Sequence, residues 1–509
     1  MLAKVYVLGM TQRPITAYNH DWQLVCMLCT EPPSLENGKA TLEKLPNGKQ
    51  GIAVTYTLQP QATWGDGTPI TTKDVLFTLE VGREPKAGVT AQELYRRILK
   101  IDVQDDKTFT VHWDRVTFEY ASLGDFRLLP EHLERPIFAA DPAQYRNRTN
   151  FDTNPTLPGL YFGPYRITQV ERGAYLVLEP NPTWWGPAPQ FKRIVIRTIE
   201  NTAALEANLL SGEIDMIAGE LGLSLDQALA FEKRHGDAFK VIYKPGLGYE
   251  HLNFNLDNPL FKDIDVRKAL LLGIDRKAIS RELFDDKQPV ADTNVNPLDW
   301  VYDPSAPHVV YDPVQAGALL DKAGWDVIKN GMRENSNGER LGFDLMTTAG
   351  NRSRELVQQV LQSQWRELGI DVRIRNEPAR VFFGQTVTQR QFTGLAMFAW
   401  ISSPESVPRS TLHSQEIPTV ENGWSGQNVG GYRNPEMDKL IDAIEVELDR
   451  DKRKALWSKL QHLYAQDLPV IPLFFRAEAY ILPPWLEGLR PTGHQFPSTL
   501  WVEEWRSTE

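Results

Sequence analysis

Hydrophobic and polar residues follow two different rhythms along this chain. At 54–58 every second residue is hydrophobic, which is typical of a half-buried strand. At 202–210 the hydrophobic residues recur with the spacing of one helix face, and Gly212 follows as a stop signal. Both patterns recur to the end of the chain. We therefore expect an α/β fold, or mixed α+β layers, rather than a helical bundle or a β-sandwich.

The same patterns place individual elements. Strands are predicted at residues 4–9, 54–58, 98–103, 108–113, from 165 onward, and at 175–178, 192–199, 252–256, 370–374 and 470–475. Helices are predicted after Thr71, where Asp74 makes a weak capping box, and at 202–210, 263–283, 313–323, 356–368, 435–448 and 456–463. The segment 22–29 fits a strand or a helix. Residues 31–51 are predicted to be surface loop, and the Gly-Leu-Gly at 246–248 to be a turn.

Composition narrows the class of protein. A chain of 509 residues predicts two to four domains. With 41% hydrophobic and 24% charged residues it is neither a disordered chain nor a collagen-like repeat. A net charge of −11 argues against a general nucleic-acid binder. No apolar run approaches the ~18 residues of a membrane span, and residues 1–10 do not form a secretory signal, so the protein is either cytoplasmic or begins after a removed signal.

No local motif in the sequence points to catalysis or to a cofactor. The phosphate-binding loop, the nucleophile elbow and the H-E-x-x-H zinc pattern are all missing, and the nine histidines are scattered singly. Cys26 and Cys29 fit a redox pair, half of a zinc site or two small buried residues, and the sequence leaves open whether they form a disulfide. Paired carboxylates carry no weight among 66 acidic residues.

Aromatic residues are the remaining signal. Tyr18, Tyr249, Trp400, Trp424 and Tyr432 lie in segments that read as loops. Aromatic side chains on such segments suit a ligand pocket, which needs apolar walls and a few polar groups. The alternative is that each ring anchors its loop to the core.

Several motifs, in order, resemble one known family. Residues 64–75 are similar to its W-x-D-G-x-P-x-T-A-x-D-V block, and 163–165 with 181–185 to its G-P-Y … N-P-x-Y-W passage. Residues 211–215 match its S-G-E-x-D turn, and 253–276 its N-x-N … V-R-x-A … I-D-R series. Gly430-Gly431-Tyr432 and Leu468-Pro469 fit as well. Over about residues 50–490 the chain resembles the family 5 extracellular solute-binding proteins, the large peptide/nickel class of ABC transporter receptors.

The resemblance implies a two-lobed periplasmic binding protein fold with an extra domain inserted in lobe one. Lobe one would comprise residues 1–35, 161–245 and 479–509, with the inserted domain at 36–160. Lobe two would be 246–478. The hinge would lie near 245–250 and 476–482. Independently of the resemblance, Arg267 and Arg276 would lie on opposite sides of one ideal helix, so we expect them to pin it from two sides as structural residues rather than ligand contacts.

The resemblance also implies a function. The protein would capture a peptide or a peptide-sized small molecule by hinge closure and deliver it to an inner-membrane ABC permease. It would be a monomer with no catalytic activity, no cofactor, no metal and no nucleic-acid partner. It would be periplasmic, its signal peptide missing from this chain, or else extracellular with a lipid anchor.

The resemblance places candidate ligand contacts on the facing edges of both lobes. They are Gln12, Arg13, Tyr18 and Phe475 on lobe one, and Tyr249, His251, Trp400, Ser402, Ser403, Glu405 and Trp424 on lobe two. Arg13 would meet a ligand carboxylate with two parallel hydrogen bonds.

One position departs from the family pattern. In peptide-binding relatives an aspartate after the strand that ends in tryptophan pairs with the peptide's α-ammonium, whereas here the matching position lies close to Ser403. Glu405 or Glu250 would then replace it, because a buried ammonium without a charged partner is strongly unfavourable. Alternatively, Ser402, Ser403 and Trp424 would hold a non-peptide solute, such as an oligosaccharide, an opine-like amino-acid conjugate or a metal chelate. A secreted hydrolase and a chaperone-like module are the alternatives from other classes.

Overall fold

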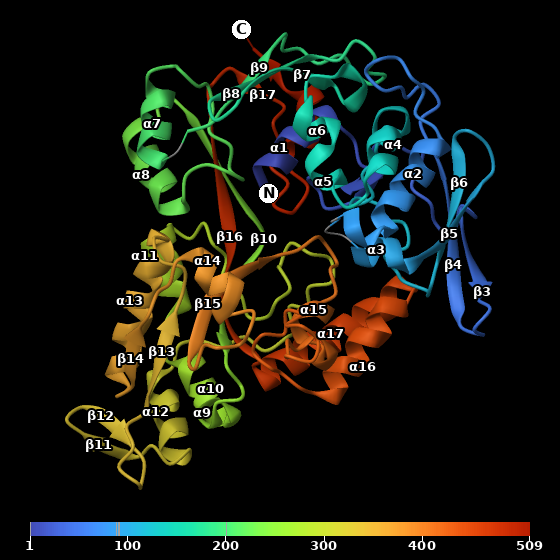
Figure 1. The fold of residues 1–509 in the computed structure, drawn as a ribbon. Coiled ribbons are helices and arrows are strands. Elements are labelled where there is room, and N and C mark those ends of the chain that lie inside the picture. Colours follow the sequence, from blue (N-terminus) through green and yellow to red (C-terminus); the bar gives the residue numbers. More distant parts are fainter. Residues whose placement is uncertain (1, 88, 90–91, 200, 509) are drawn as a thin grey trace.

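Two long strands connect the two lobes of the molecule. A computed structural model describes residues 2–87, 89, 92–199 and 201–508. In it, β10 (Lys240–Phe254) and β16 (Val470–Leu482) run side by side from the upper lobe to the lower lobe (Figure 1). They pair in antiparallel fashion, and the register shifts between Pro245 and Tyr249. The expected two-lobed, mixed α/β fold is thus confirmed, and the upper and lower lobes of Figure 1 are called lobe one and lobe two below.

Lobe two is built on a five-stranded sheet in the order β14-β13-β15-β10-β16. Strand β13 (Gly342–Met346) is parallel to β14 (Asp371–Ile374) and β15 (Leu395–Ile401), whereas β10 is antiparallel to β15 and β16. The other elements of this lobe are α9 (Pro259–Lys262), α10 (Ile264–Leu272), α11 (Arg276–Phe284), α12 (Pro313–Lys322), β11 (Val327–Lys329), β12 (Met332–Glu334), α13 (Arg352–Glu367), α14 (Ala379–Val381), α15 (Arg409–Leu412), α16 (Pro435–Val446) and α17 (Arg450–Asp467). Leu252, Trp365 and Leu473 belong to the core between sheet and helices.

Lobe one contains two smaller antiparallel sheets. The first has the order β3-β4-β6-β5 and the second β7-β8-β9. Its elements are α1 (Leu2–Thr11), β1 (Thr16–Tyr18), β2 (Leu24–Cys26), β3 (Ala40–Lys44), β4 (Gln50–Thr57), α2 (Thr72–Arg83), α3 (Gln92–Arg97), β5 (Ile98–Val103), β6 (Thr108–Trp113), α4 (Glu131–Ala140), α5 (Tyr145–Arg148), α6 (Asn150–Thr153), β7 (Tyr165–Glu171), β8 (Tyr175–Pro180), β9 (Ile194–Arg197), α7 (Thr202–Leu210), α8 (Leu225–His235), β17 (Leu486–Glu487) and β18 (Arg506–Ser507). The C-terminal segment therefore returns to the lobe in which the chain begins (Figure 1).

Locally encoded elements lie where the sequence predicts them. The Thr71 side chain accepts from the Lys73 amide, and the Asp74 carboxylate accepts from the Thr71 amide at 2.8 Å, which completes the capping box of α2. Strands β5 and β6 form the hairpin expected at 98–113, and β7 pairs with β8 as expected. Segment 22–29, left as strand or helix, contributes the short strand β2.

Three element predictions are wrong, and in the first two of them distant contacts decide the conformation. Residues 4–9 belong to helix α1, not to a strand, because the C-terminal segment packs along it: the Thr499 hydroxyl donates to the Tyr6 carbonyl at 2.7 Å. The glycines at 246–248 lie within β10, where a Cβ on Gly246 would meet the Gly493 carbonyl oxygen at 2.3 Å. The predicted loop at 31–51 contains β3 and the start of β4.

The predicted long helix 263–283 is two helices. It breaks at Gly273, and the Asp275 carboxylate caps the second helix by accepting from the Ala278 amide at 2.8 Å. Arg267 and Arg276 therefore lie on different helices. Arg267 donates to the Asp467 carbonyl at 2.8 Å, and Arg276 to the Val309 carbonyl at 2.7 Å. Arg267 ties α10 to the end of α17 and Arg276 ties α11 to a loop, so their structural interpretation stands although the single-helix geometry does not.

The two cysteines are bonded to each other. Cys26 and Cys29 form a disulfide that closes the turn after β2. The interpretation as two separate small buried residues is therefore wrong. Among the described residues, no group of three or more His, Cys, Asp or Glu side chains has the geometry of a metal site, and no helix is long and apolar enough to cross a bilayer.

Candidate functional site

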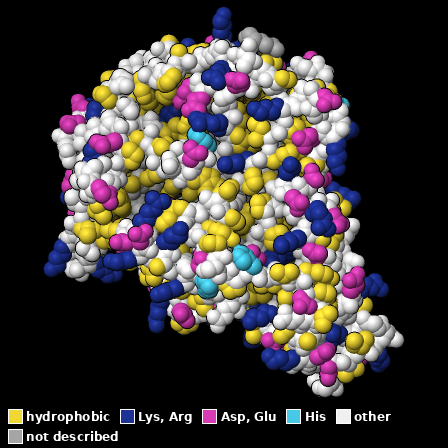
Figure 2. Space-filling view, turned by 180° about the vertical axis from the view of Figure 1, so that it is seen from behind, with side chains coloured by type: hydrophobic (Ala, Val, Ile, Leu, Met, Phe, Trp, Pro, Cys, Tyr) yellow, Lys and Arg dark blue, Asp and Glu magenta, His cyan; other side chains and the backbone are white. Residues whose placement is uncertain are grey.

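Two cavities lie where the lobes meet, on either side of the crossing strands. The first, of about 230 Å³, is called the α13 cavity; it is lined by Gly219, Glu220, Leu223, Ser224, Leu225, Gly246, Gly248, Glu250, Phe284, Gln288, Asn351, Ser353, Arg354, Val357, Met397, Ile401, Phe474, Arg476, Ala477, Glu478, Gly493 and His494. The second, of about 460 Å³, is called the Tyr18 cavity; it is lined by Tyr18, Asp21, Trp22, Gln23, Leu24, Phe118, Glu119, Ala121, Ser122, Leu298, Asp299, Trp300, Pro404, Glu405, Arg450 and Arg453. Both lobes contribute residues to the lining of each cavity. Seen from behind, hydrophobic side chains gather across the middle of the molecule, with charged side chains around them (Figure 2).

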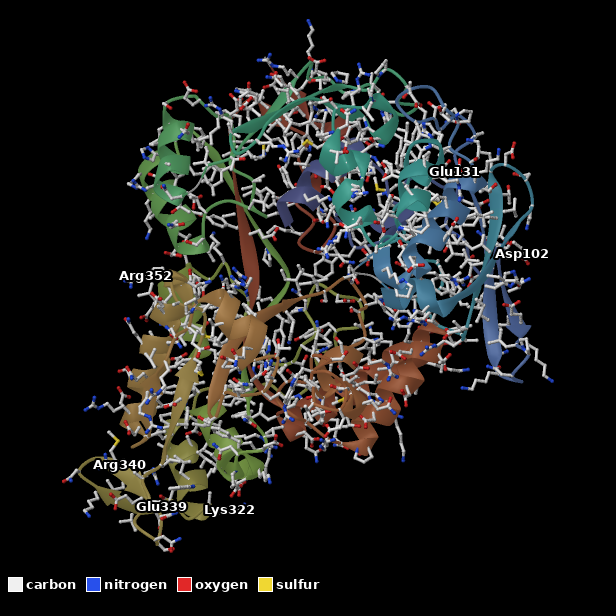
Figure 3. All side chains as sticks on the ribbon, in the orientation of Figure 1. Asp102, Glu131, Lys322, Glu339, Arg340 and Arg352 are labelled. Carbon is white, nitrogen blue, oxygen red and sulfur yellow. A yellow bond between two sulfur atoms is a disulfide. The ribbon has the colours of Figure 1, made fainter. Side chains whose placement is uncertain are left out.

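The lobes touch each other beside both cavities. On one side, the Ser353 hydroxyl in the first turn of α13 donates to the Asp226 carboxylate in the first turn of α8 at 2.6 Å. On the other side, the Phe118 amide donates to the Glu445 carbonyl at 3.0 Å. Figure 3 shows Arg352, the first residue of α13, at the edge of lobe two that faces lobe one, whereas Lys322, Glu339 and Arg340 lie at the far tip. The structure therefore has the lobes in contact.

A buried ion pair forms one wall of the α13 cavity. Glu250 on β10 is only 2% exposed, and Arg354 donates to its carboxylate from Nε at 2.7 Å and from Nη2 at 3.2 Å. Arg476 lies 3.9 Å from the same carboxylate. Because Glu250 is already paired within the chain, it is not a free acceptor for a ligand ammonium. Across the cavity, burial and the nearby charge of Glu220 raise the pKa of Glu478 to about 7.

Carboxyl groups from both lobes converge on the Tyr18 cavity. Burial raises the pKa of Glu119, from lobe one, to about 7, and it also raises the pKa values of Asp299 and Glu405, from lobe two. The Glu405 amide donates to the Asp299 carboxylate at 2.9 Å, and the Glu405 backbone has a positive φ of 59°. The Arg453 guanidinium lies 3.5 Å from the Glu405 carboxylate and 4.6 Å above the centre of the Phe118 ring.

The structure brings some of the predicted site residues together. Tyr18 and Glu405 line the Tyr18 cavity, and Ser402 and Ser403 immediately precede its wall residue Pro404. Trp400 is half-buried at the end of β15, with its ring edge-on to that of Phe398 at 5.1 Å. Trp400, Ser402, Ser403 and Glu405 therefore belong to one segment of lobe two, and Tyr18 lines the same cavity from lobe one.

Three other predicted contacts lie in the core of lobe two, and one of them, Phe475, was wrongly expected on lobe one. The hydroxyls of Tyr249 and Tyr464 are 2.8 Å apart, and Phe475 packs 5.5 Å from the Tyr249 ring. His251 stacks on Tyr249, and burial lowers its pKa to about 4, so it is neutral at pH 7. Tyr249, His251 and Phe475 line neither cavity, so we leave them out of the proposed ligand contacts.

Gln12, Arg13 and Trp424 also lie away from the two cavities. Arg13 does meet a carboxylate, but it is that of Glu503 in this chain, at 2.6 Å, and the guanidinium also lies over the Trp184 ring. Gln12 is buried beside it and donates to the Leu160 carbonyl at 3.4 Å. Trp424 has a positive φ of 60° and lies half-buried in the loop after Thr419.

Sequence reasoning missed Glu119, Asp299, Trp300 and Arg453. They come from three distant segments, and none belongs to a motif with recognisable spacing. The contact between Asp226 and Ser353 across the lobes was missed for the same reason.

Comparisons of the sequence and of the structure with known proteins agree on the family and on the fold. Residues 43–417 match the model of the bacterial extracellular solute-binding proteins, family 5 Middle. The oligopeptide-binding protein AppA of Bacillus subtilis is 24% identical over 448 residues, which cover 86% of this chain and 78% of that protein. The crystal structure of an oligopeptide-binding protein from Thermus thermophilus complexed with a pentapeptide is 28% identical, covers 99% of this chain and 92% of that one, and has a TM-score of 0.78. NikZ from Campylobacter jejuni, in complex with Ni(L-His), shares the fold at 21% identity, with 98% of this chain and 94% of that one covered and a TM-score of 0.78.

Proposed function

This chain belongs to the bacterial extracellular solute-binding proteins of family 5, and we propose that it captures a peptide or a peptide-sized solute between its two lobes for an ABC importer. The observation that carries the proposal is the pair of cavities walled by both lobes beside the crossing strands β10 and β16. A solute held there contacts both lobes only when they are together, so binding favours the closed form.

We propose that the two lobes that close on the solute have the bounds expected from the sequence. Lobe one comprises 1–35, 161–245 and 479–509 with the inserted domain 36–160, and lobe two comprises 246–478. The hinge lies at 245–250 and 476–482. The register shift between Pro245 and Tyr249 supports this position, because an irregular part of a strand pair bends more easily than a regular ladder. The closed form, with the solute bound, then docks on the outer face of a permease in the inner membrane.

Peptide is the first choice of ligand. It is supported by the relatives in Bacillus subtilis and Thermus thermophilus, which are named as oligopeptide-binding proteins. A non-peptide solute is the second choice, because the position that carries an aspartate in peptide-binding relatives lies near Ser403, which has no charge. The NikZ structure, which holds Ni(L-His), is an example of the same fold with such a ligand.

A ligand screen tests the proposal. We expect peptides of two to nine residues to raise the melting temperature, and native mass spectrometry to find the bound peptide intact after incubation. Stabilisation by neutral sugars but by no peptide would replace the first choice with the second. Cleavage of the peptide would contradict a binding function and favour the hydrolase.

A further inference from the structure

Two carboxyl groups lie close together at the proposed hinge. Glu478 belongs to β16, and Glu220 belongs to the loop that follows the bridge between Ile217 and Ile481. The Tyr480 hydroxyl donates to the Glu478 carboxylate at 3.0 Å, and the Glu220 carboxylate lies close enough to act on the same hydroxyl. The hydroxyl of one β16 residue therefore connects two acidic side chains, which are called the Glu220–Glu478 pair below.

The hydrogen bonds of Glu220 are unevenly shared between its two oxygens. Its Oε1 accepts from the Ser498 amide at 2.9 Å and from the Ser498 hydroxyl at 2.8 Å. Its Oε2 is buried, and no hydrogen bond reaches it from the part of the chain that the structure describes. A buried polar atom without a partner is unusual in a folded protein. Since a protonated carboxyl group is a hydrogen-bond donor, a proton on Glu478 would add a donor to this cluster.

Contact between the lobes keeps water away from the pair. Both carboxyl groups line the α13 cavity, and α13 of lobe two supplies the facing wall. The hydrogen bond of 2.6 Å between Ser353 and Asp226 joins α13 to α8 of lobe one at the edge of this cavity. When the lobes separate, the wall from α13 moves away and water reaches the pair. The hydration of Glu220 and Glu478 therefore depends on whether the lobes are together.

The surrounding charges do not cancel the effect of burial on Glu478. Burial and the charge of Glu220 raise the pKa of Glu478 to about 7, whereas the positive charge of Arg476 acts in the opposite direction and more weakly. His494 is neutral at pH 7, because burial lowers its pKa to about 4. The other charged or titratable groups around the cluster are Lys244 opposite Glu478 on β10, the paired Arg354 and Glu250, Asp226 on α8 and Tyr6 on α1.

We propose that the Glu220–Glu478 pair is a proton-operated switch at the hinge, which favours contact between the lobes when it holds a proton and favours their separation when it has lost it. This rests on the proposed function, because the switch regulates the same closure. Two negative charges repel each other more strongly in a poorly hydrated cavity than in water. Separation of the lobes hydrates both carboxylates and relieves this repulsion. The closed form therefore holds the proton more tightly than the open form.

The direction of the pH effect follows from this difference. The pKa of Glu478 is about 7 with the lobes in contact, and in the open form it lies closer to the ordinary value of 4.5. The advantage of the closed form is therefore complete below pH 4.5 and is lost as the pH rises through 7. Because one proton is involved, we expect the ratio of closed to open molecules to fall about three- to tenfold between pH 6 and pH 8.

A distance between the lobes tests the proposal on the full chain without any solute. Lys233→Cys on α8 and Gln359→Cys on α13, both exposed positions, carry a pair of fluorophores. Single-molecule energy transfer then counts closed and open molecules at pH values from 6 to 8. Because the pKa of Glu119 is also raised to about 7, every measurement uses the Glu119→Gln background. We expect the ratio of closed to open molecules to fall with pH by the factor given above.

Variants assign the effect to the pair. Glu478→Gln has no proton to lose, so it should keep the ratio of pH 6 at pH 8. Glu220→Gln removes the neighbouring charge that raises the pKa of Glu478 and should move the fall to lower pH. Glu282→Gln, an exposed carboxylate paired with its neighbour Arg281, is the control and should change nothing. If Glu478→Gln does not fold, the shift in Glu220→Gln decides the question.

The outcomes separate the switch from the proposed function. A ratio that falls equally with pH in Glu478→Gln and in its parent, or that does not change with pH, would overturn the switch and leave the solute receptor intact. A ratio that responds to pH through Glu478 but to no peptide of the screen would support the switch and contradict peptide capture. A single distance at every pH and with every peptide would contradict the movement of the lobes, and both claims with it.

Discussion

Arg13 and Arg354 show why a buried arginine is not automatically a ligand contact. Each is paired with a carboxylate of this chain, Glu503 for Arg13 and Glu250 for Arg354. Glu119 and Tyr18 are different, because they line a cavity and, among the described residues, their polar ends have no such partner. At the scale of single residues, the available groups are therefore acceptors of hydrogen bonds rather than guanidinium donors.

Breaking the Glu250–Arg354 pair should destabilise the protein. Arg354→Met removes two hydrogen bonds from a carboxylate that is 2% exposed and leaves only Arg476, 3.9 Å away, as a nearby cation. We therefore expect the free energy of unfolding in urea to fall by about 3 kcal/mol. The double variant Glu250→Gln/Arg354→Met should recover most of the loss. Arg281→Met, which breaks an exposed pair, serves as the control. Equal stability of Arg354→Met and the wild type would contradict the burial of this pair.

Glu119 should make stability depend on pH. Its folded-state pKa of about 7 lies above the ordinary value of 4.5, so its favourable contribution is complete below pH 4.5 and is lost as the pH rises through 7. Glu119→Gln does not titrate and should be more stable than the wild type at pH 8, by on the order of 1–2 kcal/mol, and not at pH 4.5. Thermal unfolding at both pH values measures the difference in stability between Glu119→Gln and the wild type. A difference that does not change with pH would be evidence against a raised pKa of Glu119.

At the scale of elements, the helix α2 depends on a local cap. Thr71→Ala removes the side chain that accepts from the Lys73 amide and should cost about 1 kcal/mol of unfolding free energy. Thr71→Ser keeps the hydroxyl and should retain most of the stability. Urea unfolding of both variants checks this, and equal losses in the two would show that the hydroxyl is not the stabilising group.

Elements with local signals were predictable, and those that depend on distant contacts were not. The hairpin β5–β6 and the capping box of α2 are encoded by neighbours in the sequence. The helix at 2–11 is not, because its hydrophobic residues read as a short buried strand until the C-terminal segment packs on it. The residues of the candidate site also fall into a group that the sequence identifies and a group that it does not. Tyr18 and Glu405 could be named from family motifs, whereas Glu119 and Asp299 join them only through the fold.

At the scale of the whole molecule, both polar and apolar contacts join the lobes beside the crossing strands. Ser353 meets Asp226 beside the α13 cavity, and Phe118 meets Glu445 beside the Tyr18 cavity. Opening the cleft breaks these contacts, whereas the paired strands β10 and β16 are continuous between the lobes. The balance between open and closed forms therefore depends on these polar contacts, on the apolar packing of α8 against lobe two, and on the solute.

Removing one of these contacts should weaken binding through the closed form. Ser353→Ala deletes the hydroxyl that donates to Asp226, and we expect the affinity for the tightest peptide of the screen to fall about three- to tenfold. Ser363→Ala, an exposed position on the same helix, is the matched control. Isothermal titration measures both. Identical affinities for Ser353→Ala and Ser363→Ala would mean that this contact does not help to hold the lobes together.

Small-angle X-ray scattering with and without a saturating peptide tests the closure of the two lobes most directly. The account predicts a smaller radius of gyration in the presence of peptide, with a scattering curve that matches the lobe-contacting structure. A radius of gyration that stays the same when titration shows the peptide to be bound would contradict closure on the solute.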